Sequence, residues 1–268
     1  MEGTDIDAGV TRIGHSPTLA GSLGRMGFLD RLFGKNVPAP QAAPPATDAA
    51  LAELRRTAQD AIIPGFRDFD EVVQQVQDVH ELDDAATAEA VVREVWAERR
   101  RVQEGWPSVT EGDRLRTAFA ILEARGFVAR ADFTCCNTCG TAEIDDERTP
   151  APNDETGAPQ FREWAYTFFH QQDAERLAEE PAHLFLTFSA FAPLRDLDPG
   201  LLAAADVGDE AARSEVWRQT DARVGRIVAD ALAEAGLPVE WDGDPAHRIV
   251  IPLPQWRNRL PGTAPATA

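Results

Sequence analysis

Five short segments rich in aromatic and β-branched residues constrain the fold of this chain most strongly. All five lie after Thr110, and segments of helical periodicity separate them. In chain order they read "FVARADFT", "WAYTFFH", "HLFLTFSAF", "LPVEW" and "RIVIPL". Runs of this length and composition predict strands, and the helices between them must cover the sheet that they form. We therefore predict an α+β fold, with a mostly antiparallel sheet and helices on one face.

Helices are predicted before and between these strands. Three of them, within residues 48–109, form a helical N-terminal portion: the first stops at Pro64-Gly65, the second follows the capping pair Asp68 and Glu71, and the third covers residues 84–104. Later helices are expected over residues 110–126, 173–180 and 210–235. The segment "APLRDLDPGLLAAADVGD" is read as a loop, and Asp242-Gly243 as a turn between two strands.

Four regions follow from these patterns. Residues 1–47 are expected to be a disordered leader that ends in the Pro/Ala linker "NVPAPQAAPPAT". Residues 48–109 are the helical portion, 110–260 the α+β domain, and 261–268 a disordered tail. The short amphipathic segment "MGFLDRLFGK" leaves two translation starts open, Met1 and Met26.

The charge of the chain limits its partners. The sequence holds 26 basic and 45 acidic residues, for a net charge of -19. Such a surface repels phosphate backbones, so nucleic acid is not expected as a partner, whereas a protein partner stays open. No apolar run is long enough for a signal peptide or a membrane span. Three cysteines are an odd number and lie close together, which favours reduced thiols in a cytoplasmic protein.

All three cysteines lie in "DFTCCNTCG", residues 132–140. The CxxC spacing of Cys136 and Cys139 is typical of a zinc knuckle, in which a turn directs two thiolates at one ion. Gly140 is expected to let the backbone bend with a positive φ, and the flanking "ARADFT" and "TAEID" to pair as a hairpin. On such an extended chain Cys135 would face away from the other two, because adjacent side chains point to opposite faces.

The remaining metal ligands are expected in "TFFHQQD". His170 lies where a predicted strand ends and a helix begins, and Asp173 follows three residues later. If that strand neighbours the cysteine segment, Cys136, Cys139, His170 and Asp173 form a candidate metal site, with zinc as the expected ion. The same residues also have structural roles, since cysteine packs as a small hydrophobe and aspartate caps helices.

Two other functions fit the sequence. A metal-free interaction or regulatory domain would use the cysteines only for packing. A thiol-based enzyme would use Cys135 or Cys136 as nucleophile with His170 as base, although the sequence shows no oxyanion hole and whether the chain is an enzyme stays open. No phosphate-binding glycine loop, GxSxG or HExxH motif is present.

Several segments resemble a known family. "GFVARADFTCCNTCGTAEI", "YTFFHQQDAE", "AGLPVEWDGD" and "WRNRL" are similar to an uncharacterised bacterial family, a domain of unknown function with CCxxCG and FFHxQD motifs. The resemblance covers about residues 48–260. It implies family membership, and no substrate, cofactor or catalytic residue comes with it.

Overall fold

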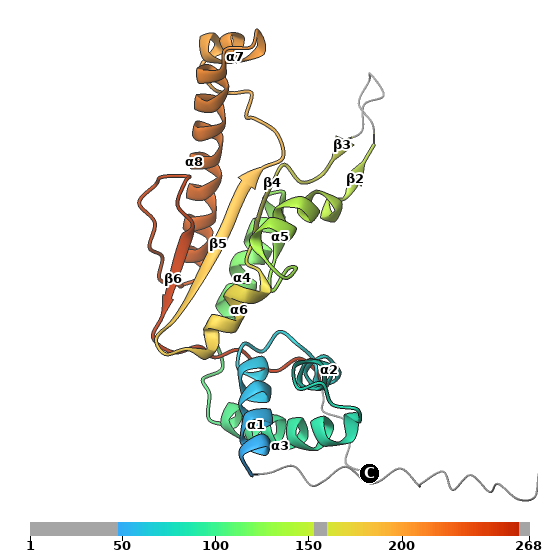
Figure 1. The fold of residues 1–268 in the computed structure, drawn as a ribbon. Coiled ribbons are helices and arrows are strands. Elements are labelled where there is room, and N and C mark those ends of the chain that lie inside the picture. Colours follow the sequence, from blue (N-terminus) through green and yellow to red (C-terminus); the bar gives the residue numbers. More distant parts are fainter. Residues whose placement is uncertain (1–47, 153–159, 263–268) are drawn as a thin grey trace, which may run out of the picture. The chain divides into compact units, whose positions relative to one another are not determined.

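The computed structural model describes residues 48–152 and 160–262, all within one compact unit, Ala46–Ala268 (Figure 1). The predicted leader, the segment from Met26 and residues 263–268 of the predicted tail lie outside the described residues.

Three helices form the N-terminal portion, as predicted. They are α1 (Asp48–Ile62), α2 (Phe69–Val79) and α3 (Ala85–Glu104). Asp68 and Glu71 form the predicted capping box of α2. The three helices bury an apolar cluster of their own, in which Trp96 is 1% exposed and its ring meets Phe69 edge to face. The helical portion therefore has a separate core.

A mixed four-stranded sheet forms the centre of the remaining chain. Its strands are β1 (Phe127–Arg130), β4 (Ala165–Phe168), β5 (Ala182–Ala190) and β6 (Ile249–Leu253), side by side in that order. β1 and β4 are parallel, whereas β4–β5 and β5–β6 are antiparallel. The α+β fold with a mostly antiparallel sheet is thus confirmed.

Two long helices, α4 (Glu111–Ala124) and α8 (Glu210–Glu234), bury their apolar residues against one face of the sheet. The other face of β1 and β4 carries a smaller cluster of Val128, Tyr166 and Phe168. It is covered by α5 (Asn137–Glu143) and by a 3-10 turn (Ile144–Glu147), whose Ile144 is buried. The short helix α5 therefore lies on the opposite face from α4 and α8.

Three segments differ from the sequence prediction. "TAEID" is not a strand but belongs to α5 and the 3-10 turn. "LPVEW" makes a single bridge, Glu240 to Val250. The predicted loop before α8 contains α7 (Pro199–Asp206), which Asp198 caps. The remaining elements are α6 (Gln171–Glu175) with a 3-10 turn (Arg176–Ala178), and the two-residue strands β2 (Pro150–Ala151) and β3 (Gln160–Phe161).

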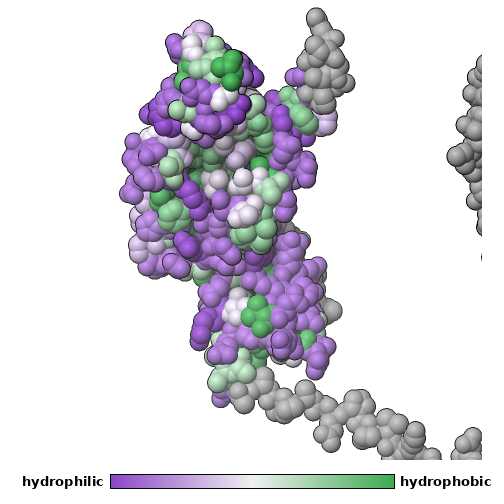
Figure 2. Space-filling view, turned by 45° about the horizontal axis from the view of Figure 1, so that its top comes forward, coloured by the Kyte–Doolittle hydropathy of each residue, from purple (hydrophilic) through white to green (hydrophobic). Residues whose placement is uncertain are grey.

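The hydrophilic surface agrees with the high content of charged residues in the chain, 26%. Figure 2 shows a face dominated by hydrophilic residues, with apolar residues in small separate patches. Among the described residues, no helix has the length and apolar character that a membrane crossing requires.

Candidate metal centre

The cysteine segment begins where β1 ends. Because β1 and β4 are parallel neighbours, the chain leaves both strands at the same edge of the sheet, into α5 and α6 respectively. Two backbone hydrogen bonds hold the exits together: Phe133 N–H donates to Phe169 O at 2.9 Å, and Gln171 N–H donates to Thr134 O at 3.0 Å. The predicted adjacency of the cysteine segment and the His170 strand is therefore present.

Two non-glycine residues with positive φ turn the chain before the cysteines. Asp132 has φ 53° and Thr134 has φ 56°. Aspartate tolerates this conformation, whereas it is unfavourable for β-branched threonine. Two hydrogen bonds of Thr134 offset the cost of this conformation. Its carbonyl accepts from the Gln171 N–H, and its Oγ1 donates to the carbonyl of Cys136 at 3.3 Å. The segment is thus a bent loop that enters a helix, and the predicted hairpin is wrong.

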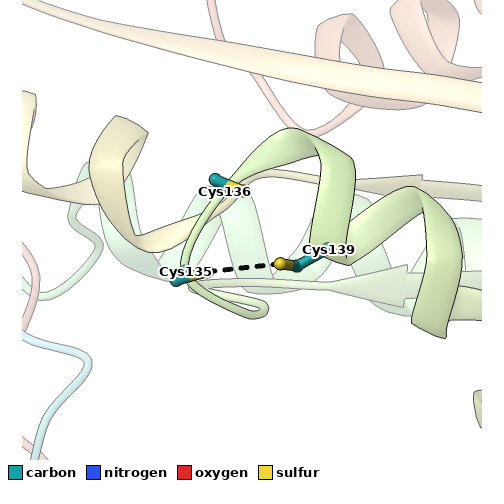
Figure 3. Close-up of side chains that lie close together, drawn as sticks. All are labelled: Cys135, Cys136 and Cys139. Carbon is teal, nitrogen blue, oxygen red and sulfur yellow. Dashed lines mark hydrogen bonds between the residues drawn. The ribbon is translucent and has the colours of Figure 1, made fainter.

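The bend brings all three cysteines together. Their sulfurs lie within 4.8 Å of one another, and Cys135 Sγ is 3.4 Å from Cys139 Sγ (Figure 3). Cys135 is exposed, while Cys136 and Cys139 are partly buried, and all three thiols are free. The expectation that Cys135 faces away is wrong, because it assumed an extended backbone where the chain turns at Thr134.

Helix α5 sets the position of Cys139 relative to Cys136. Cys136 is the N-cap residue and Cys139 lies in the first turn. Asn137 ties this turn to the sheet, since Thr187 Oγ1 on β5 donates to its Oδ1 at 2.6 Å. Gly140 is helical rather than positive in φ, so the predicted reason for this glycine is wrong. A Cβ at residue 140 would lie 2.5 Å from the Phe168 ring, so glycine allows α5 to approach β4.

The three thiols influence one another's acidity. The backbone N–H of Cys139 lies close enough to the Cys136 sulfur to lower the pKa of that thiol, although it does not form a capping hydrogen bond. Hydrogen bonding to Cys135, and to a smaller extent to Cys136, raises the pKa of Cys139 to about 12. Cys136 is therefore the thiol of this pair that deprotonates first, and the cluster loses its protons stepwise.

His170 and Asp173 form a separate buried group. His170 is the N-cap residue of α6, where its Nδ1 accepts from the Asp173 N–H at 3.3 Å and its Nε2 lies 3.0 Å from Asp173 Oδ2. Asp173 also accepts from both terminal nitrogens of Arg248, from Nη1 at 3.2 Å. Burial lowers the pKa of His170, and Arg248 lowers it further, while Asp173 opposes the shift.

Both imidazole nitrogens thus have partners within α6. Among the described residues, the group of ligand atoms that could share one ion consists of the three cysteines. The structure brings Cys136 and Cys139 together as predicted, adds Cys135, and leaves His170 and Asp173 in their own ion pair.

The family model described as "Domain of unknown function (DUF6891)" matches residues 47–260, most of the chain. The chain belongs to this family. No curated protein and no solved structure matches it in the comparisons. Family membership therefore assigns no activity, and the chemistry of this DUF6891 domain must be argued from its own residues.

A cavity in the DUF6891 domain opens beside the cysteine loop. Its volume is about 340 Å³, and its lining residues are Phe66, Arg67, Glu71, Ala131, Asp132 and Gln171. Burial raises the pKa of Asp132 to about 6, with Arg67 opposing and Glu175 and Glu71 adding to the rise. Asp132 was not predicted as a site residue, because only its position after β1 distinguishes it from the many acidic residues of the chain.

Proposed function

We propose that this domain binds a thiophilic metal ion, with zinc as the first candidate, through Cys135, Cys136 and Cys139. The observation that carries the proposal is the grouping of three sulfurs within 4.8 Å. Tetrahedral zinc with Zn–S bonds of about 2.3 Å separates its sulfurs by roughly 3.8 Å. Small side-chain rotations would bring the cluster to that spacing, because Cys135 and Cys139 are already 3.4 Å apart.

Three thiolates leave one position of a tetrahedral ion for another ligand. The exposure of Cys135 places that position within reach of water or of a small molecule. His170, the fourth ligand that the sequence suggested, would first have to leave Asp173. Reduced thiols also suit a reducing compartment, which supports a cytoplasmic location as part of the proposal.

The test is metal binding by the reduced full chain after treatment with a chelator. Zinc should bind at one ion per chain, and cobalt(II) should give thiolate-to-metal charge-transfer absorption. Each of C135S, C136S and C139S should weaken zinc binding by about tenfold or more, because each removes a ligand. The control H170N should bind zinc as the unaltered protein does.

Two results would reject this ligand set. The absence of any stoichiometric metal would favour a metal-free interaction domain whose cysteines only pack. A strong loss of affinity in H170N together with an unchanged C135S would instead support Cys136, Cys139 and His170 as the ligands.

A thiol-based reaction is the second candidate, favoured by the lowered pKa of Cys136. In the metal-free folded protein, Cys136 should then react with iodoacetamide faster at neutral pH than it does in the unfolded chain. Equal rates in the two states would count against this chemistry.

A further inference from the structure

Cys135 and Cys139 face each other more closely than a shared metal ion requires. Their sulfurs are 3.4 Å apart and point toward one another (Figure 3). A disulfide needs about 2.05 Å, so the two atoms would have to approach by about 1.3 Å. Cys135 precedes the helix, in the loop after Thr134, so this approach can occur without unwinding α5.

We propose that Cys135 and Cys139 form an oxidation site, at which a hydroperoxide converts the two thiols into a disulfide. The inference rests on the proposed metal-binding function in one respect: the disulfide would use two of the three proposed ligands. The oxidised domain would then hold only Cys136 as a thiolate, and a single thiolate does not make a zinc site.

Exposure assigns the roles of the two sulfurs. Cys135 is exposed and meets the oxidant first, while Cys139 is partly buried behind it. The Cys135 thiolate attacks the peroxide, the O–O bond breaks, and Cys135 sulfenic acid forms with release of water or an alcohol. The Cys139 thiol then attacks the Cys135 sulfur and gives up its proton, the S–O bond breaks, and the departing hydroxide takes up that proton as water.

The atoms and electrons of this sequence balance. Two thiols and one hydroperoxide give one disulfide, one alcohol (or water) and one further water. The two sulfurs lose two electrons, which reduce the O–O bond. A dithiol reductant reverses the change by thiol exchange.

Metal and oxidant would compete for the same sulfurs. A thiolate bound to zinc is less available to attack a peroxide, so the loaded site should oxidise more slowly. Oxidation of the metal-free site, in turn, should abolish metal binding until the disulfide is reduced. The fraction of the protein that holds a metal ion would thus fall as the peroxide concentration rises.

The test treats the reduced full-length protein, metal-free or zinc-loaded, with hydrogen peroxide, alkylates the remaining thiols and measures the intact mass. The metal-free protein should lose two hydrogens and carry one alkyl group. C136S, which keeps the facing pair, should form its disulfide at the rate of the unaltered protein. C135S, which keeps only Cys136 and Cys139, should form a disulfide at least about tenfold more slowly.

Specific results overturn the inference. Three alkylated cysteines after peroxide treatment of the metal-free protein would reject an oxidation site. A fast disulfide in C135S together with a slow one in C136S would move the site to the Cys136–Cys139 pair. Both results can be distinguished from a failure of the proposed metal-binding function, because zinc binding by the reduced protein is measured without peroxide. Disulfide formation without zinc binding would leave the oxidation site standing alone.

Discussion

Gly140 is the residue at which the cysteine-bearing helix comes closest to the sheet. A Cβ here would lie 2.5 Å from Cε2 of Phe168, whose ring is buried. G140A gains about 1 kcal/mol of helix propensity, but overpacking a buried contact costs about 1–3 kcal/mol. We expect a net loss of about 1 kcal/mol in unfolding free energy and weaker zinc binding, because α5 must move from β4 with Cys139. Urea unfolding and zinc titration measure both effects.

Gly105 provides the matched control for this substitution. It is the C-cap residue of α3 with a right-handed φ of -86°, and the nearest atom to an added Cβ is 3.7 Å away. G105A should change the unfolding free energy by no more than about 0.5 kcal/mol. If G140A behaves like G105A, the Phe168 contact does not explain the glycine of the CCxxCG motif.

Asp132 gives the domain a pH dependence of known sign. Its pKa rises from 3.8 to about 6 on folding because of burial. The folded state therefore binds more protons between pH 4 and pH 6, so this group's stabilising contribution is complete below pH 4 and is lost as the pH rises through 6. The full shift corresponds to roughly 3 kcal/mol, and partial exposure reduces it to about 1–2 kcal/mol. D132N should be more stable than the unaltered protein by that amount at pH 8 and equally stable at pH 4.

Urea unfolding at the two pH values measures the Asp132 effect. D146N, which removes an exposed carboxyl, is the control for the loss of one negative charge. An equal gain in stability at pH 8 from both variants would attribute the effect to net charge instead of the buried position.

At the scale of single residues, the sequence predicted some of the side-chain neighbours in the candidate site and missed others. Cys136 and Cys139 come together as their spacing predicted. Cys135 joins them because Thr134 adopts a positive φ, a conformation that is not predicted for a β-branched residue. His170 lies on the predicted neighbouring strand exit, but its ring nitrogens are taken by Asp173. Backbone bends and side-chain partners of this kind depend on contacts that are remote in sequence.

At the scale of elements, long periodic segments were predictable and short ones were not. The helices α1, α3 and α8 match their predicted ranges within a few residues. The helix α5 was not predicted, because "NTCGTAE" contains several weak helix formers and packing on β4 stabilises the helix. The helix α7 had a usable signal, since Asp198 and Pro199 are a favoured N-cap and first residue, but the segment that contains them is predicted as a loop.

The start of α6 depends on His170 as a cap, which is an unusual residue for that role. H170A removes the bond to the Asp173 N–H and the contact with the buried carboxylate, so it should lower the unfolding free energy by about 2 kcal/mol. H170N keeps a capping oxygen and should lose less. Thermal or urea unfolding of both variants measures the difference. Equal losses would show that capping is not what His170 contributes.

At the scale of the whole described chain, the C-terminal segment connects the two cores. Asn258 is fully buried, and its Nδ2 donates to the carbonyls of Pro64 and Gly65, each at 3.0 Å. Its Oδ1 accepts from Arg116 Nη1 on α4 at 2.7 Å. Gly112 leaves the space for it, since a Cβ there would lie 2.2 Å from the same oxygen. One amide therefore links the α1–α2 turn to the first helix that covers the sheet.

N258A should accordingly weaken the connection between the cores as well as the overall stability. It removes a donor from the buried carbonyls of Pro64 and Gly65, of which Pro64 keeps Trp256 Nε1, and an acceptor from the exposed Arg116. This loss should cost about 2–4 kcal/mol. Q255A, at an exposed neighbouring position, should cost less than about 0.5 kcal/mol. Hydrogen exchange distinguishes a local loss from a general one. Amides of α1–α3 should lose more protection in N258A than those of β5, because the separate helical core depends on this link while β5 lies in the main core. An equal loss in both regions would mean that the two cores unfold as one unit even without Asn258.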